Sequence, residues 1–503
     1  MTTQIRQDEI NKAVWEACDT FRGTVDAAVY KDYVLTMLFL KYISDVWQDH
    51  YNKYKQEYGN EHDLIREMMK SERFTLPDTA NFYALYKRRH EAGNGERIDL
   101  ALHAIEEANI AKLRDVFQDI SFNSNKLGEE VQKNELLKSL LEDFAKDKLD
   151  LSPKRIGKLD IIGNAYEFLI KQFAADSGRK AGEFYTPPEV SELIAEIVAP
   201  KEGDEICDPA CGSGSLLMKC GQRIQIENKG SKKYALYGQE AIGSTWALAK
   251  MNMFLHGEDN HRIEWGDTIR NPKLLDGEDS LKHFDVVVAN PPFSLEKWGH
   301  GTAEADKFGR FKRGLPPKTK GDYAFILHMV ETMKPKSGRM AVVAPHGVLF
   351  RGGSEGQIRQ KLVDENLLDA VIGLPEKLFY GTGIPAAILV FRKNKKDKNV
   401  LFIDASRAFV SGKNQNQLSE EIIARVVKTY RSRKSVEKYA YLATHAEITS
   451  NDYNLNIPKY VDTFEEEGEI DLATVRAERA KLKAELAKLE SKMDGYLKEL
   501  GYK

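Results

Sequence analysis

Apolar positions divide this chain into stretches of different periodicity. Between residues 7 and 151 they recur at three- and four-residue steps, as at Val34, Met37 and Leu38, and strand-like runs are few. This spacing is typical of helices that bury one face. We therefore predict an N-terminal helical domain over residues 1–152, with contacts to DNA or a partner.

After Pro153, short β-rich runs alternate with helical stretches, which predicts a parallel sheet covered by helices. The predicted strands are Glu205–Asp208, Tyr234–Glu240, Arg262–Trp265, Phe284–Ala289, Met340–Ala344 and Ala370–Leu374. The short loop between two further runs, Ala386–Arg392 and Val400–Asp404, predicts an antiparallel hairpin. The predicted fold class is α/β, with a Rossmann-like seven-stranded sheet in a domain of residues 153–440.

The last segment, residues 441–503, is predicted to be a helical tail. Its apolar residues alternate at three- and four-residue steps among Lys and Glu: Val475, Leu482, Leu486, Leu489, Met493, Tyr496 and Leu500. This is the seam of a coiled coil, which requires a partner helix. An amphipathic helix folded back on its own domain is an equal alternative.

Composition limits the class of protein without selecting a substrate. The 503 residues are 42% apolar and 30% charged, which is typical of a globular chain of two or three domains. The formal net charge of -3 places any nucleic-acid affinity in local basic patches. Four cysteines without a matching zinc pattern, and no long apolar run, predict a cytoplasmic protein with neither a metal nor a membrane span.

A glycine-rich turn follows the first predicted strand, in the sequence Asp208-Pro-Ala-Cys-Gly-Ser-Gly-Ser. Gly212 and Gly214 let the backbone approach a ligand, and the acidic strand tip can bind hydroxyl or ammonium groups. No Lys follows the glycines, so an ATP phosphate loop is disfavoured. The turn predicts a nucleoside-cofactor site containing Asp208, Gly212, Ser213, Gly214 and Ser215.

Acidic residues also end the next two predicted strands. Glu240 is placed to accept both hydroxyls of a ribose. Asp267 can accept a hydrogen bond from an adenine amino group, although a helix-capping role is nearly as well supported. Both residues are assigned to the cofactor.

The fourth strand ends in Asn290-Pro291-Pro292-Phe293, which we predict to be the catalytic segment. An aromatic amine is a poor nucleophile, and two acceptors on its N–H groups favour its nucleophilic form. The side-chain oxygen of Asn290 and the carbonyl of Pro291 can supply them. Phe293 can stack on a base swung out of the duplex. This indicates methyl transfer to N6 of adenine from S-adenosylmethionine, for which a parallel sheet with a reversed hairpin is the usual fold.

Two further segments complete the predicted site. Glu183, Phe184, Tyr185, Thr186, Pro187 and Pro188 form a turn into a helix that can bind the cofactor carboxylate. A Gly-rich loop between residues 297 and 320 carries Lys307, Arg310, Lys312 and Arg313. We predict that this loop closes over DNA phosphates; a solvated loop is the competing interpretation.

Together these residues resemble the modification subunit of type I restriction-modification systems. The likeness covers nearly the whole chain, and the stretch Gly373–Pro385 is its most specific part. It implies a seven-stranded methyltransferase sheet, S-adenosylmethionine as cofactor and double-stranded DNA as substrate. It also implies that two copies flank one specificity subunit, which the tail would contact, and that a restriction subunit completes the larger complex.

Two other functions remain open from the sequence alone. A methyltransferase acting on a protein glutamine amide would need the same pair of acceptors. A catalytically silent scaffold could hold a specificity protein through its helical ends.

Overall fold

The computed structural model describes residues 5–23, 25–157, 160–176, 185–379, 383–412, 415–463 and 472–501. The chain forms two compact units, Met1–Val461 and Asp462–Lys503. Within the described part, the second unit consists mainly of one helix, α18 (Leu472–Glu499). The described residues contain no helix that is both long and apolar enough to cross a membrane.

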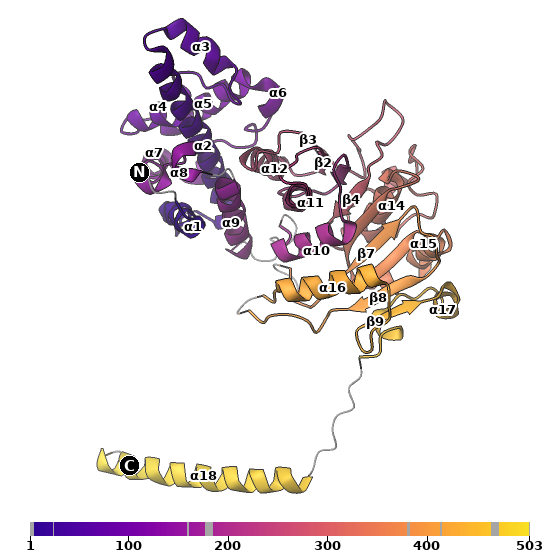
Figure 1. The fold of residues 1–503 in the computed structure, drawn as a ribbon. Coiled ribbons are helices and arrows are strands. Elements are labelled where there is room, and N and C mark those ends of the chain that lie inside the picture. Colours follow the sequence, from indigo (N-terminus) through magenta and orange to yellow (C-terminus); the bar gives the residue numbers. More distant parts are fainter. Residues whose placement is uncertain are drawn as a thin grey trace. The chain divides into compact units, whose positions relative to one another are not determined.

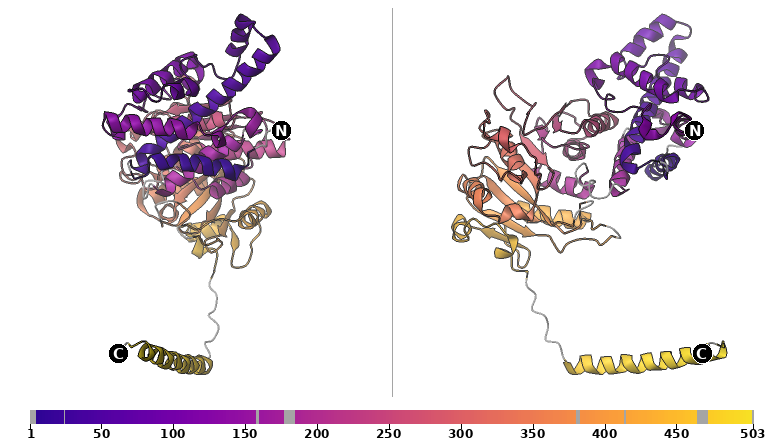
Figure 2. Two further views of the ribbon diagram at one scale, coloured as in Figure 1. Left: turned by 90° about the vertical axis from the view of Figure 1, so that its left-hand side faces the viewer. Right: turned by 180° about the vertical axis from the view of Figure 1, so that it is seen from behind.

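The predicted helical character of the N-terminal region is confirmed (Figure 2), whereas its predicted end at residue 152 stays a prediction. The region forms α1 (Gln7–Glu16), α2 (Ala27–Tyr58), α3 (His62–Lys70), α4 (Phe82–Lys87), α5 (Asn94–Ala108), α6 (Ile110–Leu113) and α7 (Glu130–Phe144), and two further helices, α8 (Pro153–Ile156) and α9 (Asp160–Asp176), follow it. The ring of Phe74 meets Phe254 edge to face, so the helical bundle packs against the sheet domain.

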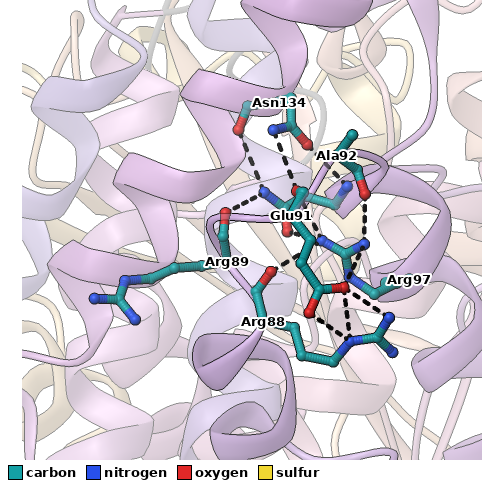
Figure 3. A network of polar contacts seen from close by, with 7 residues as sticks. Arg88, Arg89, Glu91, Ala92, Arg97 and Asn134 are labelled. Atoms are coloured by element: carbon teal, nitrogen blue, oxygen red, sulfur yellow. Dashed lines mark hydrogen bonds and ion pairs between the residues drawn. The ribbon is translucent and has the colours of Figure 1, made fainter.

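Polar contacts fix the turn between α4 and α5 (Figure 3). Arg97 donates to the carbonyls of Arg88 and Glu91 at 3.1 and 3.0 Å, and Arg88 forms an ion pair with the Glu91 carboxylate. The Asn134 side chain on α7 accepts from the backbone N–H of Asn94 at 2.9 Å. These bonds give hydrogen-bond partners to backbone groups that the turn would otherwise leave unpaired.

Among the described residues, nine strands form one sheet in the order β3-β2-β1-β4-β5-β7-β6-β8-β9 (Figure 1). Their bounds are β1 (Glu205–Asp208), β2 (Ala235–Glu240), β3 (His261–Trp265), β4 (Val286–Ala289), β5 (Arg339–Pro345), β6 (Leu368–Gly373), β7 (Ala386–Arg392), β8 (Val400–Asp404) and β9 (Ala440–Ala443). The α/β Rossmann-like class is confirmed, whereas the count of seven strands is corrected, because β8 and β9 extend the sheet beyond β6.

The predicted hairpin of β7 and β8 is wrong. Strand β7 lies between β5 and β6, antiparallel to both, and β8 pairs with β6 in parallel. The residues of β7 are buried along nearly its whole length, which suits a central strand with neighbours on both sides. Loop length alone could not reveal that a strand is inserted between two others.

Helices cover both faces of the sheet. Alternate strand residues point to opposite faces and join different cores, as Val286 and Val288 do on one face and Val287 and Ala289 on the other. The sheet domain also contains α10 (Pro188–Val198), α11 (Ser215–Glu227), α12 (Gly243–Leu255), α13 (His300–Ala303), α14 (Asp322–Thr332), α15 (Gly353–Asp364), α16 (Glu420–Ser432) and α17 (His445–Ser450). Residues of α10, α11, α12 and α16 pack into the first core, and those of α14 and α15 into the second.

The strand register gathers the candidate residues at one edge. Strands β1, β2 and β4 are parallel neighbours, with Cys207 opposite both Tyr237 and Val287. Their carboxyl ends therefore meet, and ligands of open α/β sheets bind at such an edge.

Candidate active site

The glycine-rich turn between β1 and α11 has the backbone that its sequence predicts. Gly212 and Gly214 have φ of +53° and +81°, which other residues rarely adopt. A Cβ on Gly214 would also lie 2.6 Å from Cε of Met253. The Asn252 side chain on α12 donates to the Ser213 carbonyl at 3.0 Å and fixes the turn. Substitution of Gly214 would therefore strain the turn.

Two acidic side chains stand at the base of this turn. Asp208 is buried, and its Oδ1 accepts from the N–H of Ala210 at 2.9 Å. Burial raises its pKa to about 8, and the negative charge of Glu240 adds to this effect. Glu240 accepts from the N–H groups of Gly212 and Ile242 at 3.0 and 2.9 Å, while burial raises its pKa as well. Glu240 thus holds the turn directly.

Asn290 follows the end of β4 and faces the turn with an unused acceptor. Its Nδ2 donates to Oγ1 of Thr186 at 3.1 Å. Its Oδ1 is buried and has no hydrogen-bond partner in the structure. A buried acceptor without a donor is costly, which makes Oδ1 of Asn290 a candidate to accept a hydrogen bond from a ligand.

One small cavity joins the two parts of the site. It is lined by Tyr185, Thr186, Asp208, Ala210, Cys211, Gly212, Ser213, Ser215, Leu216 and Asn290. The cavity therefore brings together six of the predicted cofactor residues with the predicted catalytic amide. Pro188 begins α10 as expected, with Pro187 before it, whereas Glu183 and Phe184 lie outside the described residues.

Asp267 does not line this cavity. Its Oδ1 accepts from the N–H groups of Ile269 and Arg270 at 2.9 and 2.8 Å, and its other oxygen forms an ion pair with Arg270. These are the contacts of the capping role that the sequence left open. An adenine contact by Asp267 stays a prediction.

The loop after β4 is held by residues that the sequence analysis did not single out. Phe293 contacts Phe379 edge to face, with ring centroids 5.7 Å apart, and Phe379 belongs to the stretch Gly373–Pro385, of which residues 380–382 are not described. Ser294 has a φ of +51°, and its N–H donates to Asp322 at 2.7 Å. Pro291 is buried and Pro292 is partly buried. The loop is thus fixed on both sides of Phe293.

The four predicted DNA-contacting cations all have acidic partners. Arg310 and Arg313 are only 3% and 4% exposed; Arg310 pairs with Asp306, and Arg313 with Glu331 and Glu365. These contacts give both arginines a structural role. Their contact with DNA stays a prediction.

Lys307 and Lys312 are more accessible. Their side chains are 57% and 58% exposed, and they pair with Asp279 and Glu331. The Lys307–Asp279 pair is exposed and contributes little stability, whereas Lys312 is the exposed partner of the largely buried Glu331. Both lysines can therefore reach a phosphate.

Comparison with known proteins independently supports the predicted class of enzyme. The model of the family "N-6 DNA Methylase" matches residues 157–469, and that of the "HsdM N-terminal domain" matches residues 10–144. The type I restriction enzyme MpnII methylase subunit of Mycoplasma pneumoniae is 32% identical, over 93% of this chain and 92% of its own. The MjaVIII methylase subunit of Methanocaldococcus jannaschii is 33% identical, over 99% and 85%.

A solved structure agrees with these relatives. The methyltransferase subunit of a type I restriction-modification system from Streptococcus thermophilus is 35% identical, with a TM-score of 0.80 over 91% of this chain and 100% of that one. The matches confirm the predicted resemblance and the predicted class of enzyme, S-adenosylmethionine-dependent DNA methyltransferases of adenine N6, and they do not favour a glutamine-amide enzyme or a silent scaffold. The chain belongs to the N-6 DNA methylase family, among the methylase subunits of type I restriction-modification systems.

Proposed function

We propose that this chain methylates N6 of adenine in DNA at the cavity between the glycine turn and Asn290. The observation that carries the proposal is the buried, unpartnered Oδ1 of Asn290. A target base whose amino group reaches Oδ1 would supply the missing donor. The bond from Nδ2 to Thr186 keeps the amide turned so that Oδ1 remains available.

The residues around the cavity fit S-adenosylmethionine. Asp208 and Glu240 offer acceptors for ribose hydroxyls or an ammonium group, while Ser213 and Ser215 offer hydroxyls. The segment that contains Tyr185 and Pro188 lies on the Asn290 side of the same cavity. When bound, the cofactor supplies an electrophilic methyl group on a positively charged sulfur.

The role of Asn290 is to raise the nucleophilicity of the amine. Its Oδ1 would accept one N–H of the amino group, and the carbonyl of Pro291 would accept the other. Electron density is then held on nitrogen instead of being delocalised into the ring. Phe293, steadied by Phe379, offers an aromatic face for a base that has left the duplex.

Partners are proposed from the tail and from the relatives. Apolar side chains along α18 are exposed, among them Leu482 at 61%, Leu486 at 55% and Leu489 at 65%. Such a stripe of exposed apolar side chains indicates that α18 packs against a partner helix. We assign it to a specificity subunit flanked by two copies of this chain, with double-stranded DNA held between them and a restriction subunit in the larger complex.

Methyl transfer with a labelled cofactor tests this function. With the specificity subunit present, we expect label in N6-methyladenine after digestion of duplex DNA to nucleosides. Label in glutamine of a protein would favour the other enzyme class. Absence of label from both DNA and protein would favour a scaffold.

Neutral substitution of the two exposed lysines tests the basic loop. Lys307→Gln with Lys312→Gln should weaken DNA binding for all sequences alike and reduce the salt slope by about 2, because two phosphate contacts are lost. Arg313→Gln is the contrast: it should lower the melting temperature, since it removes a buried cation from Glu331 and Glu365. Unchanged DNA affinity and salt slope in the double lysine variant would exclude the loop from the interface.

A further inference from the structure

A second cavity, of about 460 Å³, lies at the sheet edge opposite to Asn290. One of its lining residues, Arg392, ends β7 and stands opposite Arg339, the first residue of β5. Arg339 in turn stands opposite Val286, the first residue of β4, whereas Asn290 follows the other end of β4. The cavity is therefore separate from the methyl-transfer site, and we call it the Lys395 cavity.

A buried carboxylate organises one wall of the Lys395 cavity. Asp369 is 4% exposed and lies where the register of β6 against β7 shifts, an irregularity that can redirect a side chain. It accepts from the Tyr430 hydroxyl and from Arg433, both at 2.7 Å, and Arg392 approaches it at 3.4 Å. Two guanidinium groups are thus held in place beside the cavity.

The lining also includes two lysines, Lys395 and Lys396, without a carboxylate partner among the described residues. Lys395 donates to the carbonyls of Leu368 and Asn399, at 2.5 and 2.9 Å, which leaves one of its three protons unassigned. Lys396 is exposed. Burial lowers the pKa of Lys395 to about 8; the charge of Asp369 opposes this shift and that of Arg433 adds to it. An anion in the cavity would stabilise the charged form of Lys395.

The charge balance of the lining is positive. It contains five cations, Arg392, Lys395, Lys396, Arg431 and Arg433, against two carboxylates, Asp369 and Asp397. Arg431 is neutralised from outside the cavity, by Glu196 at 2.8 Å. Arg431 and Arg433 lie at the carboxyl end of α16, where positive charge stabilises the helix dipole. The two lysines come from the loop after β7, so this role does not explain them.

We propose that the Lys395 cavity binds a phosphate group, with Lys395, Lys396 and the terminal nitrogens of Arg392 as its donors. Converging cations on fixed backbone elements are suited to a multiply charged phosphate. The volume of the cavity suits either a nucleotide or a backbone phosphate of a nucleic acid. Free nucleotide and nucleic acid are therefore the two sources to distinguish.

Calorimetric titration of the full chain with pyrophosphate tests the site. Lys396→Glu should weaken binding about tenfold, because it removes one charge-assisted hydrogen bond and adds repulsion. Lys395→Met should weaken it similarly without adding a negative charge. Lys398→Glu, in the same loop but outside the cavity lining, is the matched control and should bind like the wild type.

Melting temperatures close to that of the wild type would show that the variants are folded. The proposal is overturned if the wild type does not bind millimolar pyrophosphate, or if all three variants bind it alike. A nucleoside triphosphate that binds more tightly than pyrophosphate, and is weakened by Lys396→Glu, identifies a nucleotide as the ligand. Displacement of pyrophosphate from the wild type by duplex DNA identifies backbone phosphates instead.

Discussion

Replacement of Asn290 by Ala should lower the rate of methyl transfer about 10³-fold, the scale on which loss of one preorganised polar contact acts. The variant loses the buried Oδ1 that awaits the amino group of the base. Cofactor affinity should change little, because Asp208, Glu240 and the glycine turn are intact. Single-turnover transfer and calorimetric cofactor binding, measured on the same preparation, separate the two effects.

Asn290→Asp is the matched control for this prediction. Aspartate keeps an acceptor at the same place but loses the donor to Thr186. It should therefore retain more activity than the alanine variant while transferring more slowly than the wild type. Equal activity of the wild type and Asn290→Ala would show that Asn290 takes no part in methyl transfer.

Replacement of Asp208 by Asn should weaken cofactor binding at least tenfold and stabilise the free protein at the same time. The positively charged cofactor favours the ionised form of Asp208, and a hydrogen bond to a charged acceptor is worth more than one to a neutral amide, which explains the loss of affinity. The gain in stability arises because the buried carboxyl is costly to ionise. Cofactor affinity should therefore fall while the melting temperature rises, and both are measured on the same preparation of the variant.

The pH dependence follows from the direction of the Asp208 shift. Its pKa rises from the ordinary 3.8 to about 8 in the folded protein. Between these values the folded chain holds a proton that the unfolded chain has released, so this group makes stability fall as pH rises. Each pKa unit is worth about 1.4 kcal/mol, so the loss across the whole interval is on the order of 6 kcal/mol. Asp208→Asn should flatten this slope.

Glu240→Gln provides the contrast. Both Glu240 oxygens accept backbone N–H bonds, from Gly212 and Ile242, and an amide can replace only one of them. The same chemical change should therefore destabilise the protein here. Stabilisation by Glu240→Gln, or destabilisation by Asp208→Asn, would contradict the electrostatic account of the turn.

The sequence predicted the parts of the site that depend on local backbone chemistry. Gly212 and Gly214 are needed where φ is positive, and Asn290 follows a buried strand that two prolines end. The order of the strands then brings Asp208 and Asn290 to one edge. The local sequence pattern and the predicted parallel sheet together were therefore sufficient to predict where the site lies.

What could not be predicted depends on contacts between distant segments. The bond from Asn290 to Thr186 spans 104 residues, and the contact of Phe293 with Phe379 depends on the loop after β6. The insertion of β7 between β5 and β6 has no signal in loop length. Nor does the basic character of the loop after β4 reveal that Arg310 and Arg313 are buried with acidic partners.

The most direct test of the central claim is a structure of the complex with a cofactor analogue and duplex DNA containing the target adenine. We expect the base outside the duplex, with its N6 about 3 Å from Oδ1 of Asn290 and from the Pro291 carbonyl. It would be contradicted by a target adenine whose amino group lies elsewhere, with Oδ1 of Asn290 bonded to the protein.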